Sequence, residues 1–152
     1  MPSLVTERIE SVKAGIVGAG SFAVAESVFG LAKIFLVNLV TYDSAAIKET
    51  IVFDWTWSIE LAIGAISGFL FGVTYRYVIR SDRNSHLNDG AVLAFGLVRG
   101  LALIEKNLVL SELLSLGGLV LQSIICFAIA RLVLDLAIAR KLIKPFVRVT
   151  ND

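Results

Sequence analysis

Seven ionisable residues lie inside long apolar stretches of the sequence, where a charge is costly unless another group compensates it. They are Glu26, Lys33, Glu60, Arg99, Glu105, Arg131 and Asp135. An unpaired charge at the middle of a membrane costs about 2.5 to 3.5 kcal/mol on insertion scales, so these residues are expected to pair with one another. The set holds four acids and three bases. The acid in excess must stay protonated or bind a cation, both of which are starting points for proton or cation traffic.

Depth along the helices sorts these charges into layers, at a rise of ~1.5 Å per residue. Glu26 and Arg99 fall near the midplane and are predicted to pair. Lys33 falls towards the outer side, at the depth of Glu60 and Glu105, and is predicted to contact both carboxylates. A third contact is expected inside one helix, nearer the inner side, because its two members are spaced four residues apart. These members are Arg131 and Asp135.

Three interpretations of the charge layers stay open at this point. Ion pairs of this kind fix which helices meet and in what register. Alternatively, the charges conduct protons or ions, or bind a ligand. As a third interpretation, side chains near the outer surface, such as Glu60 and Glu105, reach the aqueous interface and are solvated there.

Four apolar windows must position these charges. Crossing ~30 Å of hydrocarbon takes about 20 apolar residues in a helix, and the windows run over about 13–40, 57–79, 90–110 and 113–138. Lipid offers no partner for unpaired backbone groups, so each window is expected to be helical. We therefore predict an all-α fold, an integral membrane four-helix bundle in which 1–152 form a single domain with a basic C-terminal tail over 139–152.

The composition excludes several other classes of protein. The chain is 57% hydrophobic and 18% charged, which leaves too little polar surface for a soluble enzyme. Its net charge of +1 gives no excess for binding nucleic acid. With one Cys and one His, no metal site, haem ligand pair or disulfide framework is expected, and no cofactor is predicted. The expected surroundings are a lipid bilayer and other membrane helices, or a second copy of this chain.

The distribution of cations predicts the orientation, because Lys and Arg near short loops stay cytoplasmic. Two cations, Lys48 and Lys106, fall on one side. Nine fall on the other side: Arg8, Lys13, Arg76, Arg80, Arg83, Arg140, Lys141, Lys144 and Arg148. Both termini are therefore expected in the cytoplasm, or in the stroma of an organelle. Aromatic residues that would anchor the second helix at its two interfaces are Trp55, Trp57, Tyr75 and Tyr77.

A cleavable signal peptide is the alternative for the first helix. Arg8 and Lys13 precede an apolar run that reaches the A-x-A pattern at 23–25. Against cleavage, Glu7 and Glu10 dilute the positive charge, and apolar residues resume after the pattern. We favour an uncleaved membrane helix.

Glycines recur every fourth residue in the second and third helices. They are Gly64, Gly68 and Gly72 in the second, and Gly96 and Gly100 in the third. A missing side chain lets two helix backbones approach closely in lipid. This spacing favours a tight pair, either the second helix against the third or a homodimer, although glycine is also simply common in membrane helices.

Two partial resemblances accompany these patterns. The segments YRYVIRSD at 75–82 and GAVLAFGLVRG at 90–100 resemble small four-helix membrane proteins of cyanobacteria and plastids, which implies a thylakoid or plasma membrane location and no particular activity. The sequence around Glu26, with Lys33 after it, resembles the first helix of small multidrug resistance transporters, which carries an essential glutamate. This chain departs from that family at Arg99 and Arg131, and its charge asymmetry predicts one orientation only.

The functional prediction is a non-enzymatic small membrane subunit, scaffold or assembly factor of a larger membrane complex. The basis is the small soluble surface and the lack of any recognisable catalytic motif in the sequence. The alternative is a proton-coupled small transporter or ion-conducting oligomer in which Glu26 titrates beside Arg99. A pigment or quinone binder is a third possibility, which the single His disfavours.

Overall fold

Four helices make up the part of the chain that the structure, a computed structural model, describes: residues 4–40, 55–79, 85–106 and 113–144. Helix α1 spans Leu4–Val40, α3 spans Trp55–Val78, α4 spans Ser85–Lys106 and α5 spans Leu113–Ala139. Each helix is long and apolar enough to cross a membrane. The all-helical prediction is confirmed for these residues.

Two helices have boundaries that differ from the predicted windows. Helix α1 begins at Leu4 instead of residue 13, and α4 begins at Ser85 instead of residue 90. The added turns carry acids that pair with other helices, such as Glu7 and Asp89. The predicted apolar windows exclude these charged residues. In the structure the charged side chains pair with other helices, so the helices continue through them. Residues 107–110, predicted as the end of the third helix, lie outside the described residues.

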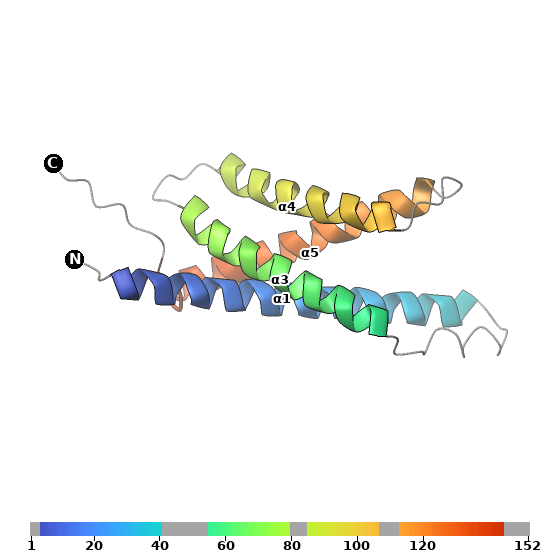
Figure 1. Cartoon of the computed structure of the whole chain (residues 1–152), viewed down its shortest axis with the longest axis horizontal. Helices are drawn as coiled ribbons and strands as arrows, with labels where there is room; N and C mark the ends of the chain where they lie inside the picture. Colours follow the sequence, from blue (N-terminus) through green and yellow to red (C-terminus); the bar gives the residue numbers. More distant parts are fainter. Residues whose placement is uncertain (1–3, 41–54, 80–84, 107–112, 145–152) are drawn as a thin grey trace.

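The bundle is built from two helix pairs, as Figure 1 shows. Helix α1 packs along α3, and α4 packs along α5, while α5 also lies against α1 and joins the two pairs. Helices α3 and α4 contact each other much less. The first turns of α1 and the end of α5 lie at the same end of the bundle. This arrangement agrees with termini on one side of a membrane. Lys48, Arg80, Arg83 and Arg148, which entered the orientation argument, lie outside the described residues.

Close glycine packing is present, but its partners differ from the prediction. A Cβ on Gly68 would lie 2.7 Å from the Gly18 carbonyl oxygen of α1, and one on Gly72 would lie 3.2 Å from the Gly15 Cα. The glycines of α3 therefore face α1 and not α4. The reason is that α1 offers its own small residues at the crossing, which lets both backbones approach.

The glycines of α4 face α5 instead of α3. A Cβ on Gly96 would lie 2.8 Å from the Ile124 Cα, and one on Gly100 would lie 2.7 Å from the Val120 Cα. The expected pairing of the second helix with the third is therefore wrong, and each glycine helix packs on a different neighbour. The spacing of the glycines predicts a close helix contact but does not specify which helix makes it.

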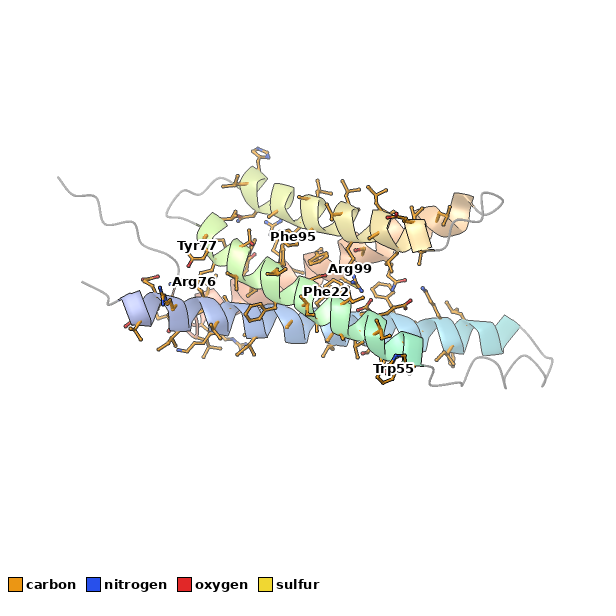
Figure 2. The ribbon with its side chains drawn as sticks, in the orientation of Figure 1. Phe22, Trp55, Arg76, Tyr77, Phe95 and Arg99 are labelled. Atoms are coloured by element: carbon orange, nitrogen blue, oxygen red, sulfur yellow. The ribbon has the colours of Figure 1, made fainter. Side chains whose placement is uncertain are left out.

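Three of the four aromatic residues predicted as interface anchors are exposed, and one is buried. Trp55 is 78% exposed at the start of α3, while Tyr77 is exposed near the end of the same helix, where Figure 2 shows it beside Arg76. Trp57 is also exposed. Tyr75 is fully buried, so its prediction as an interface anchor is wrong. Residues two positions apart on a helix differ by about 200° in direction, so Tyr75 and Tyr77 cannot both face outward.

Helix α5 ends in a cap that turns the chain back onto the bundle. The Leu142 N–H donates to the Ala137 carbonyl and the Lys141 N–H to the Ile138 carbonyl, both at 2.9 Å. Lys141 adopts φ 59°, the left-handed conformation that such a cap needs at this position. Ile143 then packs into the core at 2% exposure. The cap thereby brings Lys144 against α1 and α3.

Candidate functional site

The predicted pair between α1 and α4 is present in the middle of the bundle. Arg99 Nη2 lies 2.5 Å from Glu26 Oε1, and the same nitrogen donates to the Glu60 carbonyl at 3.4 Å. The Arg99 side chain is 7% exposed and that of Glu26 is 17% exposed. The guanidinium also lies over the Phe22 ring, 5.0 Å from its centroid (Figure 2). Arg99 is therefore held by a carboxylate and an aromatic face of α1.

Gly64 makes room for this ion pair. A Cβ on Gly64 would lie 3.0 Å from Arg99 Nη2 and 3.0 Å from the Phe22 ring, and it would also clash with Glu26 Oε2. The first glycine of the α3 series therefore receives charged side chains, while the next two receive the backbone of α1. The four-residue spacing predicts backbone packing for all three glycines and gives no sign of this role.

Only one oxygen of the Glu26 carboxylate accepts a hydrogen bond from the described residues. Oxygen Oε2 is buried and accepts no hydrogen bond from the described residues. A buried polar atom in that condition costs about 1 to 3 kcal/mol. Lys33 and Glu60 lie near enough for their charges to act on Glu26. The carboxylate therefore has one oxygen held by Arg99 and a second oxygen with unused acceptor capacity.

The outer layer does not assemble as predicted. Lys33 is exposed on α1, Glu105 is exposed on α4, and Glu60 is partly buried on α3. Among the ion pairs of the described residues, none joins Lys33 to Glu60 or Glu105. Both Lys33 and Glu105 lie near helix ends and project outward, where solvation competes with pairing.

A second cluster, called the inner cluster after its predicted depth, ties α3, α4 and α5 together near the end of the bundle where α4 begins. Arg131 pairs with Asp89 of α4, and its Nε lies 3.6 Å from Asp135 Oδ2, one turn along α5. The Tyr75 hydroxyl donates to Asp135 Oδ1 at 2.7 Å. The predicted contact of Arg131 with Asp135 is present, whereas Asp89 and Tyr75 were not identified as partners. Tyr75 is buried because this hydrogen bond satisfies its hydroxyl inside the core.

A third cluster, which sequence reasoning missed, surrounds Arg76 at the end of α3. Arg76 is 1% exposed, and each of its nitrogens donates a hydrogen bond. Nη2 donates to Glu7 Oε2 at 2.5 Å and Nη1 to Ser11 Oγ at 2.7 Å, both on α1. Nε donates to the Lys144 carbonyl at 2.9 Å. Arg76 thus binds α1 and the segment after α5 to the end of α3.

Glu10 completes the Arg76 cluster from the same face of α1. Its Oε2 accepts the Lys144 N–H at 3.0 Å, and its Oε1 lies 2.8 Å from Lys13 Nζ. The Ser11 hydroxyl lies 3.0 Å from the Tyr77 hydroxyl. The available signal was the spacing of Glu7, Glu10 and Ser11, three and four residues apart on one helix face. These acids were interpreted only as a dilution of the positive charge.

Four phenylalanines separate the middle pair from the inner cluster. Each helix contributes one: Phe22 from α1, Phe71 from α3, Phe95 from α4 and Phe127 from α5. The Phe127 ring centroid lies 4.6, 5.2 and 5.7 Å from those of Phe22, Phe71 and Phe95. Phe22, Phe71 and Phe127 are buried. This aromatic layer closes the interior of the bundle between the two polar sites.

A cleft of about 560 Å³ opens between α3 and α4, which contact each other far less than α3 contacts α1 or α4 contacts α5. Its walls are mostly apolar, with Ile63 and Leu70 on α3 and Phe95 and Val98 on α4. The polar residues that line it are Glu60, Ser67 and Arg99. We call it the α3–α4 cleft. A molecule that enters this cleft from outside the bundle can reach the Arg99 guanidinium.

The described residues hold no group of three or more His, Cys, Asp or Glu side chains arranged for a metal ion. No protein-family model matches the chain, and neither a curated protein nor a solved structure matches it. The resemblances to phototroph membrane proteins and to small multidrug resistance transporters stay predictions.

Proposed function

We propose that this protein is an integral membrane protein with both termini in the cytoplasm or stroma, and that it acts non-enzymatically as a subunit, scaffold or assembly factor of a larger membrane complex. The location would be the plasma membrane, or a thylakoid if the phototroph resemblance holds. The observation that carries the proposal is the way its buried charges are used. The buried Arg76 and Arg99 and the partly buried Arg131 each join different helices of this same chain.

Charges that hold helices in register favour a structural role over conduction. Arg99 joins α4 to α1, Arg131 joins α5 to α4, and Arg76 joins α3 to α1. The aromatic layer lies between the middle pair and the inner cluster, which disfavours a polar route along the bundle axis. The long lipid-facing helices then offer surface to neighbouring membrane proteins.

Purification from its own membranes in a mild detergent tests the proposal. A subunit or scaffold is expected to recover one or more other membrane proteins in constant stoichiometry across detergents. A carbonate wash of the membranes should leave the protein in the pellet. Recovery of the chain alone as a homodimer, or release by carbonate, would contradict the proposal.

One observation favours the alternative, a proton-coupled transporter or ion-conducting oligomer. Glu26 keeps a buried oxygen without a donor among the described residues, and its partner Arg99 lines the α3–α4 cleft. A carboxyl in that condition can take up and release a proton. In liposomes that report internal pH, a scaffold should give no flux. Flux that is lost in Glu26→Gln and kept in Glu105→Gln, its exposed counterpart, would favour transport.

A further inference from the structure

The α3–α4 cleft combines an apolar lining with one buried cation. Its volume of about 560 Å³ lies in the range of pockets that hold small organic molecules. Phe95 and Phe127 offer ring surfaces, and the α3 wall runs from Ile59 to Leu70, a length of about 16 Å along the helix. A ligand with a flat head and a short apolar tail matches this shape.

Arg99 retains hydrogen-bonding capacity towards the cleft. A guanidinium has five N–H donors on three nitrogens. Both hydrogen bonds that Arg99 forms with described residues come from Nη2, to Glu26 and to the Glu60 carbonyl. The donors on Nε and Nη1 are therefore available to an acceptor oxygen in the cleft.

Charge and depth restrict the ligand further. Glu26 already balances the charge of Arg99, so an anion would have to displace a carboxylate that is held at 2.5 Å. Arg99 also lies within about 5 Å of the middle of the span His86–Glu105. Phospholipid phosphates lie outside the ~30 Å hydrocarbon core, beyond the reach of this guanidinium. A neutral molecule that dissolves in hydrocarbon meets both conditions.

We propose that the α3–α4 cleft binds a neutral, hydrocarbon-soluble molecule with ring carbonyl oxygens, the chemistry of a quinone, and that Arg99 donates a hydrogen bond to one of these oxygens. The ring lies against Phe95 and Phe127, and the tail follows the apolar wall of α3. This inference rests on the membrane insertion proposed above and adds a ligand to the structural role.

A second groove serves as an internal comparison. It lies between α1 and α5, where it is lined by residues such as Gly20, Val24 and Val133. Its hydroxyl, that of Ser21, already donates to the Val17 and Gly18 carbonyls. This α1–α5 groove is apolar like the cleft, but its lining residues include no cation to orient a carbonyl. A quinone should therefore prefer the α3–α4 cleft.

Photolabelling tests the inference on the full chain in nanodiscs of phosphatidylcholine. The probe is an azido-benzoquinone with a decyl tail, with unlabelled decylubiquinone as the competitor. We expect labelled peptides from 59–70 and 94–103, and labelling that saturates and is competed. Labelling spread over every lipid-facing helix without saturation, or concentrated in the α1–α5 groove, would overturn the inference. Competition by the anionic lipid phosphatidylglycerol would overturn it too, in favour of a lipid headgroup.

Two tryptophan substitutions on neighbouring residues of α4 provide the matched variants. Ala94→Trp fills the cleft and should reduce cleft labelling about tenfold or more, whereas Leu93→Trp, an exposed position outside the cleft, should leave it within about twofold. Equal labelling of the two variants would contradict the inference. If Ala94→Trp does not fold, the inference is tested by the labelled peptides of the unmodified protein and by whether their labelling saturates. Failure to enter nanodiscs would instead count against membrane insertion.

Discussion

The Arg76 cluster and the Arg99 site are both centred on a buried arginine, but they differ in how completely that arginine is satisfied. Arg76 donates from all three nitrogens to α1 and to the segment that follows α5. Arg99 donates from Nη2 only, and its partner Glu26 has a buried oxygen without a donor among the described residues. A cluster in which every arginine nitrogen already donates a hydrogen bond holds the helices together. An unsaturated pair beside a cleft keeps capacity for a ligand or a proton.

The largest effect is expected for Arg76→Met. The substitution leaves the Glu7 carboxylate and the Lys144 carbonyl without their donor, and breaking a buried ion pair from one side costs about 3 to 5 kcal/mol. Thermal unfolding of the purified chain in mild detergent measures the loss. Arg8→Met, at an exposed position of the same cluster's helix, is the control and should change little. Arg99→Met should cost less than Arg76→Met, because Glu26 can neutralise by taking a proton; the reverse order would refute the contrast.

Gly68→Leu should have the next largest effect. Its side chain would meet the Gly18 carbonyl oxygen of α1, and overpacking of a close contact costs about 1 to 3 kcal/mol. The expected result is a lower melting temperature and separation of α1 from α3, which a crosslink between these helices would report. Gly20→Leu is matched, because a Cβ there meets nothing within 4 Å. Equal stability of the two variants would mean that α1 and α3 do not approach closely.

Glu26→Gln sharpens the comparison at the Arg99 site. Glutamine keeps one acceptor oxygen for Arg99 and loses the charge, so we expect a loss of about 1 to 2 kcal/mol, well below that of Arg76→Met. The same thermal measurement applies, with Glu105→Gln as the exposed control. A loss of stability as large as that of Arg76→Met would show that the pair of Glu26 and Arg99 stabilises the fold as much as the Arg76 cluster does.

Among the buried positions, Tyr75→Phe should have the smallest effect. It removes the 2.7 Å hydrogen bond to Asp135 and keeps the ring in the core. Hydrogen bonds between membrane helices contribute about 0.6 kcal/mol on average. Tyr77→Phe is the control: it removes a hydroxyl that lies 3.0 Å from the Ser11 hydroxyl, at an exposed position of the same helix end, and should cost still less. If Tyr77→Phe proves the more destabilising of the two, the inner cluster contributes less than its burial suggests.

The sequence predicts the parts of this fold that depend on length and depth. Four helices follow from the apolar windows, and the contact of Glu26 with Arg99 follows from their matched positions along two helices. These predictions need no knowledge of how each helix is rotated about its axis. Depth is fixed by the chain itself and by the thickness of the hydrocarbon.

The parts that depend on rotation and on neighbours were not predictable in this way. The glycine spacing on α3 and α4 is the same whichever helix lies opposite, and the structure pairs them with α1 and α5. The burial of Arg76 and Tyr75 follows from the rotation of α3, which no local pattern specifies. Asp89 precedes the predicted window 90–110, and its pairing with Arg131 requires the added first turn of α4.

The contact of Lys144 with Glu10 has a consequence for biosynthesis. The residues joined by this hydrogen bond are 134 positions apart, so the ribosome releases one of them only after nearly the whole polypeptide has been made. Until then, Arg76 lacks its Lys144 acceptor, and the ring from α5 is missing from the aromatic layer. Under the proposed membrane insertion, the first three helices enter the bilayer without the contacts of α5, and an insertase or chaperone that covers their exposed surfaces would protect the nascent chain from degradation.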